Sequence, residues 1–389
     1  MNRVDVRVDS RVELLSIVQM FTSWRDSVIV KKDYKYKRDA LEWFKPYRNH
    51  RVIELCEYLR DFQCMCMPTG FMVHVTEPPE LKFIEKLDLN TIYSFTWFIS
   101  SKLGDWFNKY FEKSKAIKLY GINRSKYALL PGLKARAEEE LMLLGEFMAK
   151  RVLNEFIEYL RNFVYKSNFI EFFDMHRSFY EALIEKSKLK HSVPKIISYL
   201  KDFFKKYEEH VSVILCPLYG SFAFGHGFND KTFVFIGPRR IVNDFPIFEG
   251  VEDLILNELS RIVGIYCARY FDEIMEYSYL FEYLGDYVKS IHGVWIQALN
   301  VHLASAIEAI IKHHYMGIPK EEIASYLDQK ERMGFIFVKD FYKLLDEYVK
   351  KKDEYNSFEE FFPRIIKLLK TLAESTSKDL ERKEDLRRG

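Results

Sequence analysis

The segment 254–268, LILNELSRIVGIYCA, constrains the fold most, because it is apolar on almost every side of a helix. That pattern is typical of a helix buried in the middle of a domain. Its polar residues Asn257, Glu258 and Arg261 stand at i, i+1 and i+4, so they share one side of the helix. Each would cost about 1 to 3 kcal/mol if it were buried without a partner. We therefore expect this side to line a functional site or the remains of one.

The same spacing matches the H-E-x-x-H motif of zinc metallopeptidases, with Asn257 and Arg261 at the histidine positions and Glu258 at the position of the general base. The motif needs two imidazole nitrogens that reach one zinc ion at about 2.0 to 2.1 Å. A guanidinium is always protonated and offers no lone pair, and an amide oxygen is a weaker zinc ligand than imidazole. Taken alone, the pattern is more typical of a structural helix that contains one glutamate.

Composition argues against several classes of protein. The 389 residues include 59 Lys and Arg against 57 Asp and Glu, with both signs interspersed, so nucleic acid is not an expected partner. The N-terminal residues are charged and lack the apolar core of a signal peptide. The longest uncharged run, 211–229, is too rich in Gly and polar residues to span a membrane. Five cysteines fit a reducing compartment, so we expect a cytoplasmic protein.

Hydrophobic periodicity predicts a mainly α-helical chain with a small β-sheet, which is an α+β protein. Asp9 offers an N-cap for a helix over 11–21, and Ser10 and Glu13 have the spacing of a capping box. Strands are expected at 70–76, 211–215 and 232–236, and further helices at 194–210, 271–288, 294–315, 339–351 and 357–372.

A glycine-rich segment, Tyr219 to Gly227, separates the last two predicted strands, and we expect it to be a loop. It lacks the glycine spacing of phosphate-binding loops. No linker forces a domain boundary, so we expect a single domain over 1–373 with a helical lobe at about 87–190. The polar residues 374–389 are expected to form a disordered tail.

Short segments spread along the chain carry a resemblance to a known family. They are VDSRVELL at 8–15, FKPYRNH at 44–50, PPEL at 78–81, Tyr219-Gly220, IGP at 236–238, Gly334-Phe335 and YNSFEEFFP at 355–363. In this order they resemble an uncharacterised prokaryotic family catalogued as domain of unknown function 4932, which itself resembles gluzincin-type zinc metallopeptidases. The resemblance implies a zincin-like metallopeptidase core with extra helices.

The resemblance also implies roles for individual positions. It places histidine ligands at Asn257 and Arg261, the general base at Glu258 and a glutamate ligand at about Val301. Because the chain departs from the family pattern at all three ligands, the resemblance implies that the zinc has been lost. No H-x-x-x-H or E-x-x-H spacing occurs elsewhere, so a rebuilt metal site would need scattered histidines such as His302.

Glu258 without zinc needs another positive charge, and Arg261 at i+3 has the spacing to supply it. If the resulting ion pair is buried, Arg261→Ala should cost about 3 to 5 kcal/mol of stability.

Three hypotheses for function remain open. The leading one is a catalytically degenerate metallopeptidase relative, without a metal cofactor, that binds a peptide or protein in the former cleft. One alternative is an active metal-dependent hydrolase with an atypical zinc site around Glu258 and His302. The other is a structural or assembly protein, which predicts an exposed apolar face and self-association. The residues expected to form the binding site are Asn257, Glu258, Arg261, Tyr219, Gly220 and His302.

Overall fold

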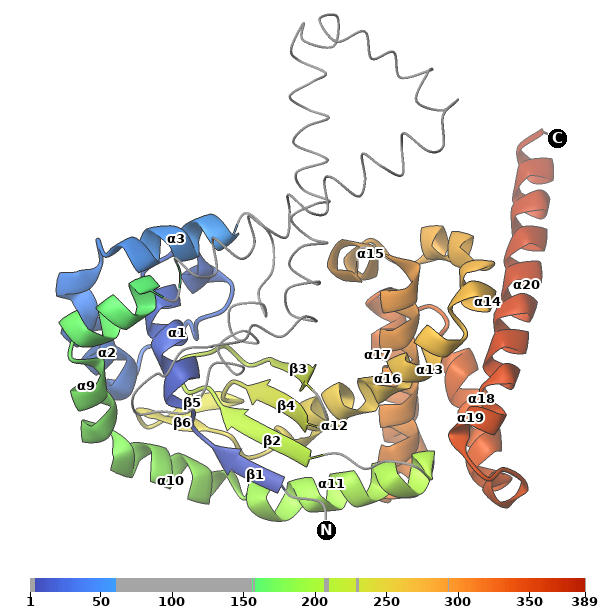
Figure 1. The fold of residues 1–389 in the computed structure, drawn as a ribbon. Coiled ribbons are helices and arrows are strands. Elements are labelled where there is room, and N and C mark those ends of the chain that lie inside the picture. The colour runs from blue at the N-terminus through green and yellow to red at the C-terminus, as the bar shows by residue number, and fades with distance from the viewer. Residues whose placement is uncertain are drawn as a thin grey trace, which may run out of the picture.

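The computed structural model describes residues 4–60, 156, 158–205, 210–228, 231–292 and 294–388. Helices dominate, and the described strands form one four-stranded and one two-stranded sheet, which confirms the predicted α+β class. In Figure 1 the larger sheet lies beside a group of C-terminal helices, with α12 between the two. The strand expected at 70–76 and most of the lobe expected at 87–190 lie outside the described residues.

The larger sheet has the strand order β1-β2-β4-β3. β1 (Val4–Arg7), β2 (His210–Leu215) and β4 (Lys231–Ile236) run parallel to one another. β3 (Ala223–Phe228) pairs antiparallel with β4. Among the described strands, β3 therefore forms one edge of this sheet and β1 the other.

The sequence predicts β2 and β4 to within one residue at each end. It is wrong about β3, which occupies part of the glycine-rich segment expected to be a loop. Gly225 and Gly227 prevent the prediction of this strand, because glycine has a low β propensity and no apolar side chain that would contribute to an alternating pattern. β1 was not predicted, because its Val-Asp-Val-Arg alternation is only four residues long.

Helices cover both faces of the larger sheet. α12 (Glu252–Ser260) lies on the face of Gly225, where an added Cβ would come within 3.3 Å of Glu258 Oε2. α1 (Ser10–Met20) lies on the other face, where the Tyr219 hydroxyl donates a hydrogen bond to Gln19 Oε1 at 3.1 Å. The sheet thus fixes the position of α12 directly.

α1 begins at the N-cap Asp9, as predicted, and the Asp9 side chain accepts a hydrogen bond from the Arg11 N–H at 3.1 Å. The predicted capping box is absent, because with Asp9 as the N-cap the box position falls on Val12 rather than Glu13. Glu13 is instead fully buried, and its carboxylate accepts a hydrogen bond from the Tyr36 hydroxyl at 2.6 Å. Burial raises the pKa of Glu13 to about 8, although the bond from Tyr36 lowers it.

The other helices flank this core on two sides (Figure 1). Before β2 they are α2 (Lys35–Phe44), α3 (Arg51–Arg60), α9 (Phe169–Met175), α10 (Arg177–Ser187) and α11 (Leu189–Phe204). A hairpin of β5 (Arg240–Val242) and β6 (Phe245–Ile247) follows β4 in the chain. In the C-terminal half they are α13 (Gly264–Arg269), α14 (Phe271–Met275), α15 (Asp286–His292), α16 (Trp295–His314), α17 (Lys320–Arg332), α18 (Val338–Lys350), α19 (Phe358–Phe361) and α20 (Pro363–Arg388).

The continuous helix predicted over 254–268 is divided. A 3₁₀ turn at Arg261–Val263 separates α12 from α13. The chain passes close to α16 there, and a Cβ added to Gly264 would lie 2.6 Å from Asn300 Nδ2. A side chain at this position would have to displace the end of the Asn300 side chain.

Other predicted helices also differ from the structure, and the one over 357–372 is divided between α19 and α20. The segment 271–288 is divided between α14, a 3₁₀ helix over Ser278–Tyr283 and α15. α11 begins at Leu189 rather than at Pro194, and it contains that proline. The tail expected to be disordered continues α20 to Arg388, because it is rich in the strong helix formers Lys, Arg and Glu.

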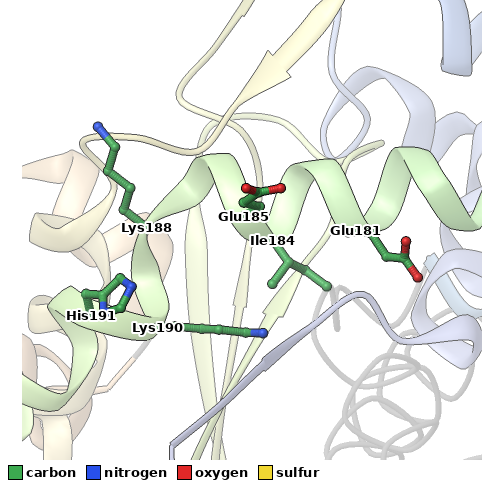
Figure 2. Close-up of a pocket in the computed structure, with 6 residues that line it drawn as sticks. All are labelled: Glu181, Ile184, Glu185, Lys188, Lys190 and His191. Carbon is green, nitrogen blue, oxygen red and sulfur yellow. The ribbon is translucent and has the colours of Figure 1, made fainter.

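Two surface hollows lie beside α10, one of about 260 Å³ at its corner with α11 and one of about 280 Å³ between its C-terminal end and β6. Figure 2 shows that the side chains lining the first hollow point in different directions rather than toward one centre. This hollow is therefore not arranged as a binding site. None of the helices in the described part of the chain is both long and apolar enough to cross a membrane.

Candidate functional site

Glu258 joins α12 to the edge strand of the larger sheet. Its Oε2 accepts a hydrogen bond from the backbone N–H of Gly225 in β3 at 2.8 Å, and its Oε1 lies 3.1 Å from a guanidinium nitrogen of Arg261. The Glu258 side chain is 5% exposed, whereas that of Arg261 is 39% exposed. The predicted ion pair is therefore present, but solvent reaches its arginine.

Burial raises the pKa of Glu258 above its ordinary value, although Arg261 and the Gly225 N–H both act to lower it. The nearby charge of Glu308 raises the pKa further. Arg261 thus offsets only part of the cost of burying this carboxylate. Arg261 therefore supplies less of the positive charge that Glu258 needs without zinc than was predicted from the sequence.

Glu308 on α16 is the second buried carboxylate of the site, and it is 3% exposed. Its Oε2 accepts hydrogen bonds from Asn257 Nδ2 and from the Tyr326 hydroxyl, each at 2.7 Å. Its Oε1 accepts one from Lys312 Nζ at 2.5 Å. These bonds tie α12, α16 and α17 together around one carboxylate.

Lys330, one turn after Tyr326 on α17, completes the cluster. Its ammonium lies 5.4 Å from the ring centroid of Tyr326 and 5.4 Å from that of Phe335. Burial lowers the pKa of Lys330, and the charge of Arg261 lowers it further while that of Glu308 raises it. Lys330 is therefore within electrostatic range of the Arg261 and Glu308 side chains. We call Asn257, Glu258, Arg261, Glu308, Lys312, Tyr326 and Lys330 the polar cluster.

The donors of the polar cluster do not suit zinc. At the two positions where histidine ligands were expected, Asn257 offers an amide bound to Glu308 and Arg261 offers no lone pair. Both carboxylates already accept hydrogen bonds or ion pairs from protein groups. In the described ranges, no group of three or more His, Cys, Asp or Glu side chains is arranged to hold a metal ion.

The other predicted site residues lie elsewhere. His302 is buried on α16, where its Nδ1 lies 2.7 Å from the Ala298 carbonyl oxygen and its ring centroid 5.0 Å from that of Phe335. Tyr219 bonds to α1, as described above, and Gly220 donates its N–H to the Val28 carbonyl at 2.8 Å. The structure thus brings Asn257, Glu258 and Arg261 together but places Tyr219 and Gly220 in the contact between β3 and the N-terminal helices.

Comparison with known proteins identifies the family. The model of the family described as Domain of unknown function (DUF4932) matches residues 137–368. The chain belongs to this family. No curated protein and no solved structure matches it.

The DUF4932 region contains β3, α12, α16 and α17, and hence the whole polar cluster. Glu308 is not among the site residues predicted from the sequence, since the resemblance implies a glutamate near Val301 instead. Val301 and Glu308 are seven residues apart, which is about two helical turns, so they share one side of α16. A usable signal was present, since Glu308 is the one acidic residue between Trp295 and His314.

In the DUF4932 region, β3 has an outer edge that α12 reaches. Gly237 donates its N–H to the Phe222 carbonyl at 3.0 Å, which makes these two residues a hydrogen-bonded pair just before β3. In an antiparallel ladder such pairs alternate with pairs whose backbone groups point away from the partner strand. The backbone groups of Ala223, Gly225 and Gly227 therefore point to the outer edge, and Glu258 bonds to the middle one.

Proposed function

We propose that this DUF4932 member is a catalytically degenerate relative of zinc metallopeptidases that binds an extended peptide along the edge strand β3. One observation carries the proposal. Glu258, at the position of the general base in the motif, accepts a hydrogen bond from the outward N–H of Gly225 in that strand. The candidate site is therefore adjacent to β3, the edge of the larger sheet among the described strands.

The edge of β3 offers main-chain groups to a peptide. Ala223 and Gly227 present outward N–H and C=O groups on either side of Gly225. An extended peptide that adds to a sheet edge gains affinity from such main-chain hydrogen bonds. At Gly225 the missing side chain leaves the space that Glu258 occupies.

Catalysis of the zinc-peptidase type is not part of this proposal. Arg261 occupies a position where the motif requires a zinc ligand. Glu258 forms an ion pair with Arg261 and accepts a hydrogen bond from Gly225. The alternative, a hydrolase with an atypical metal site, needs His302 near Glu258, but the His302 ring packs against Phe335. That alternative predicts an activity that chelators remove and that Glu258→Gln abolishes.

Equilibrium dialysis of the full chain against a random library of N-acetylated pentapeptides tests the proposed function. Mass spectrometry identifies the retained peptides, and hydrogen exchange then locates them. We expect a retained peptide to slow exchange in the β3 segment and to leave β1, at the opposite edge, unchanged. Retention of no peptide, or protection at a site away from β3, would refute the proposal.

A second candidate, an assembly function, rests on a separate observation. Five large hydrophobic side chains between residues 265 and 294 are at least 42% exposed, and they come from α13, α14, the 3₁₀ helix, α15 and the residue before α16. Such a concentration on one segment is typical of a contact surface. Light scattering over a concentration series would reveal self-association through it. The residues are Ile265, Phe271, Tyr279, Tyr287 and Val294.

A further inference from the structure

Glu258 occupies a backbone donor that an added peptide strand needs. Its Oε2 lies 2.8 Å from the nitrogen of Gly225, whose N–H points to the outer edge of β3. A strand that adds along Ala223 to Gly227 places one of its carbonyl oxygens at that N–H. The Glu258 carboxylate therefore takes the place of a peptide carbonyl.

The Glu258 side chain also fills the space over Gly225. A Cβ added to Gly225 would lie 3.3 Å from Glu258 Oε2 and 3.6 Å from Glu258 Cβ. The side chain is packed between α12 and β3, since only 5% of it is exposed. A peptide cannot form the hydrogen bond to Gly225 while Glu258 holds this position.

Arg261 gives Glu258 a second partner that lies outside β3. A guanidinium nitrogen of Arg261 is 3.1 Å from Oε1, the other oxygen of the Glu258 carboxylate. The two residues stand at i and i+3, so the ion pair can persist when the carboxylate turns away from β3. Arg261 is partly exposed and can follow this movement. Leaving Gly225 therefore costs Glu258 one hydrogen bond but not its ion pair.

A charged side chain at a sheet edge prevents unwanted strand pairing. A permanent cover of this kind would hold the carboxylate through β3 alone. Here the carboxylate is shared between the Gly225 N–H and a partner on its own helical turn. This sharing favours a cover that can be withdrawn.

We propose that Glu258 is a gate on the edge strand β3. Bonded to Gly225 it excludes the peptide, and turned toward Arg261 it admits the peptide. This inference rests on the proposed function and adds the regulation of the same site. A hydrogen bond to a charged group favours the closed form by about tenfold. The affinity measured for a peptide is then about tenfold lower than the affinity of the open form.

The first test compares the natural chain with Glu258→Ala in equilibrium dialysis against the random library of N-acetylated pentapeptides. Removing the carboxylate frees the Gly225 N–H, so the retained peptides should bind about tenfold more tightly. Glu252→Ala, on the same helix, should leave the affinity unchanged. Circular dichroism shows whether each variant is folded.

Arg261→Ala tests the gate in the opposite direction. Without the guanidinium, the carboxylate keeps its bond to Gly225 and loses the partner that lies outside β3. The closed form gains, so peptides should bind about two- to fivefold more weakly. The exposed Arg332→Ala should have no effect. This comparison decides the question if Glu258→Ala does not fold.

Hydrogen exchange of the Gly225 amide gives a readout that does not need a peptide. In the chain without peptide, Glu258→Ala should make this amide exchange faster, because the amide loses its acceptor. An unchanged exchange rate would show that Glu258 does not close the edge, and it would overturn the inference.

The outcomes with peptide separate the two proposals. If peptides protect β3 but bind the natural chain, Glu258→Ala and Arg261→Ala equally, the gate is wrong while the peptide-binding function stands. If Glu258→Ala weakens binding, Glu258 contacts the peptide and the gate is again wrong. If neither the natural chain nor these variants retain any peptide, both proposals are wrong.

Discussion

Glu258 and Arg261 form the ion pair at the centre of the candidate site. The sequence predicts this pair from i, i+3 spacing, but it does not predict that solvent reaches Arg261. The Arg261 side chain is 39% exposed. Breaking this pair should therefore cost less free energy of unfolding than breaking a buried pair, and its cost should be closer to that of a surface pair.

Arg261→Ala is therefore expected to lower the free energy of unfolding by about 1 kcal/mol, rather than by the larger cost of a buried pair. Glu258 keeps its hydrogen bond from Gly225 in this variant, which limits the loss. Urea unfolding followed by circular dichroism measures the change, with the exposed Arg332→Ala as the control. An effect no larger than that of the control would contradict a role for the pair in stability.

Glu13 gives a second prediction at the scale of single residues. Its ordinary pKa of 4.5 applies to the unfolded chain, and burial raises the pKa in the folded chain to about 8. The unfolded chain therefore loses this proton first, and the stability contributed by protonated Glu13 is complete below about pH 4.5 and is lost as the pH rises through about 8.

Glu13→Gln should remove this loss, so the variant should gain stability relative to the natural chain between pH 5 and pH 9. Unfolding by urea at several pH values in that range checks the sign, and the exposed Glu54→Gln is the matched control. If the difference between the Glu13→Gln variant and the natural chain does not change with pH, Glu13 does not titrate as described.

At the scale of elements, Glu308 connects three helices through hydrogen bonds to Asn257, Lys312 and Tyr326. Removing one member of a buried charged pair leaves the other uncompensated, which costs about 3 to 5 kcal/mol. Glu308→Gln should therefore be strongly destabilising, while the double variant with Lys312→Met should lose less than the sum of the two single losses.

A double-mutant cycle of these variants by urea unfolding should give a coupling of about 1 to 3 kcal/mol. Losses that add to within about 0.5 kcal/mol would mean that Lys312 and Glu308 act independently. In that case Glu308 would not be the point where α12, α16 and α17 are joined.

Several elements were predictable, because periodicity and capping are local properties. The sequence predicts α1 with its N-cap, β2, β4, α16 and α18 to within about two residues. The break between α12 and α13 was not predictable, because the apolar pattern continues across it. The partner of Glu13 was not predictable either, because Tyr36 lies on another helix.

At the scale of the whole molecule, the candidate site was predictable only in part. The spacing of Asn257, Glu258 and Arg261 lies within one helix and indicates the site. Their partners Glu308 and Lys330 follow Glu258 by 50 and 72 residues, and no local pattern connects such distant positions. β3 also contributes to the site, through Gly225. It could not be predicted from apolar alternation, because its glycines interrupt that pattern.

The central claim is that protein groups, and not a metal, satisfy Glu258 and Glu308. The zinc content of the full chain tests this claim most directly. Mass spectrometry would measure it on protein purified without added metal, before and after dialysis against zinc and then against a chelator. We expect far less than one zinc per chain after chelation. About one zinc per chain that survives chelation would contradict it, because the partners described for Asn257, Glu258 and Arg261 leave no ligands for the ion.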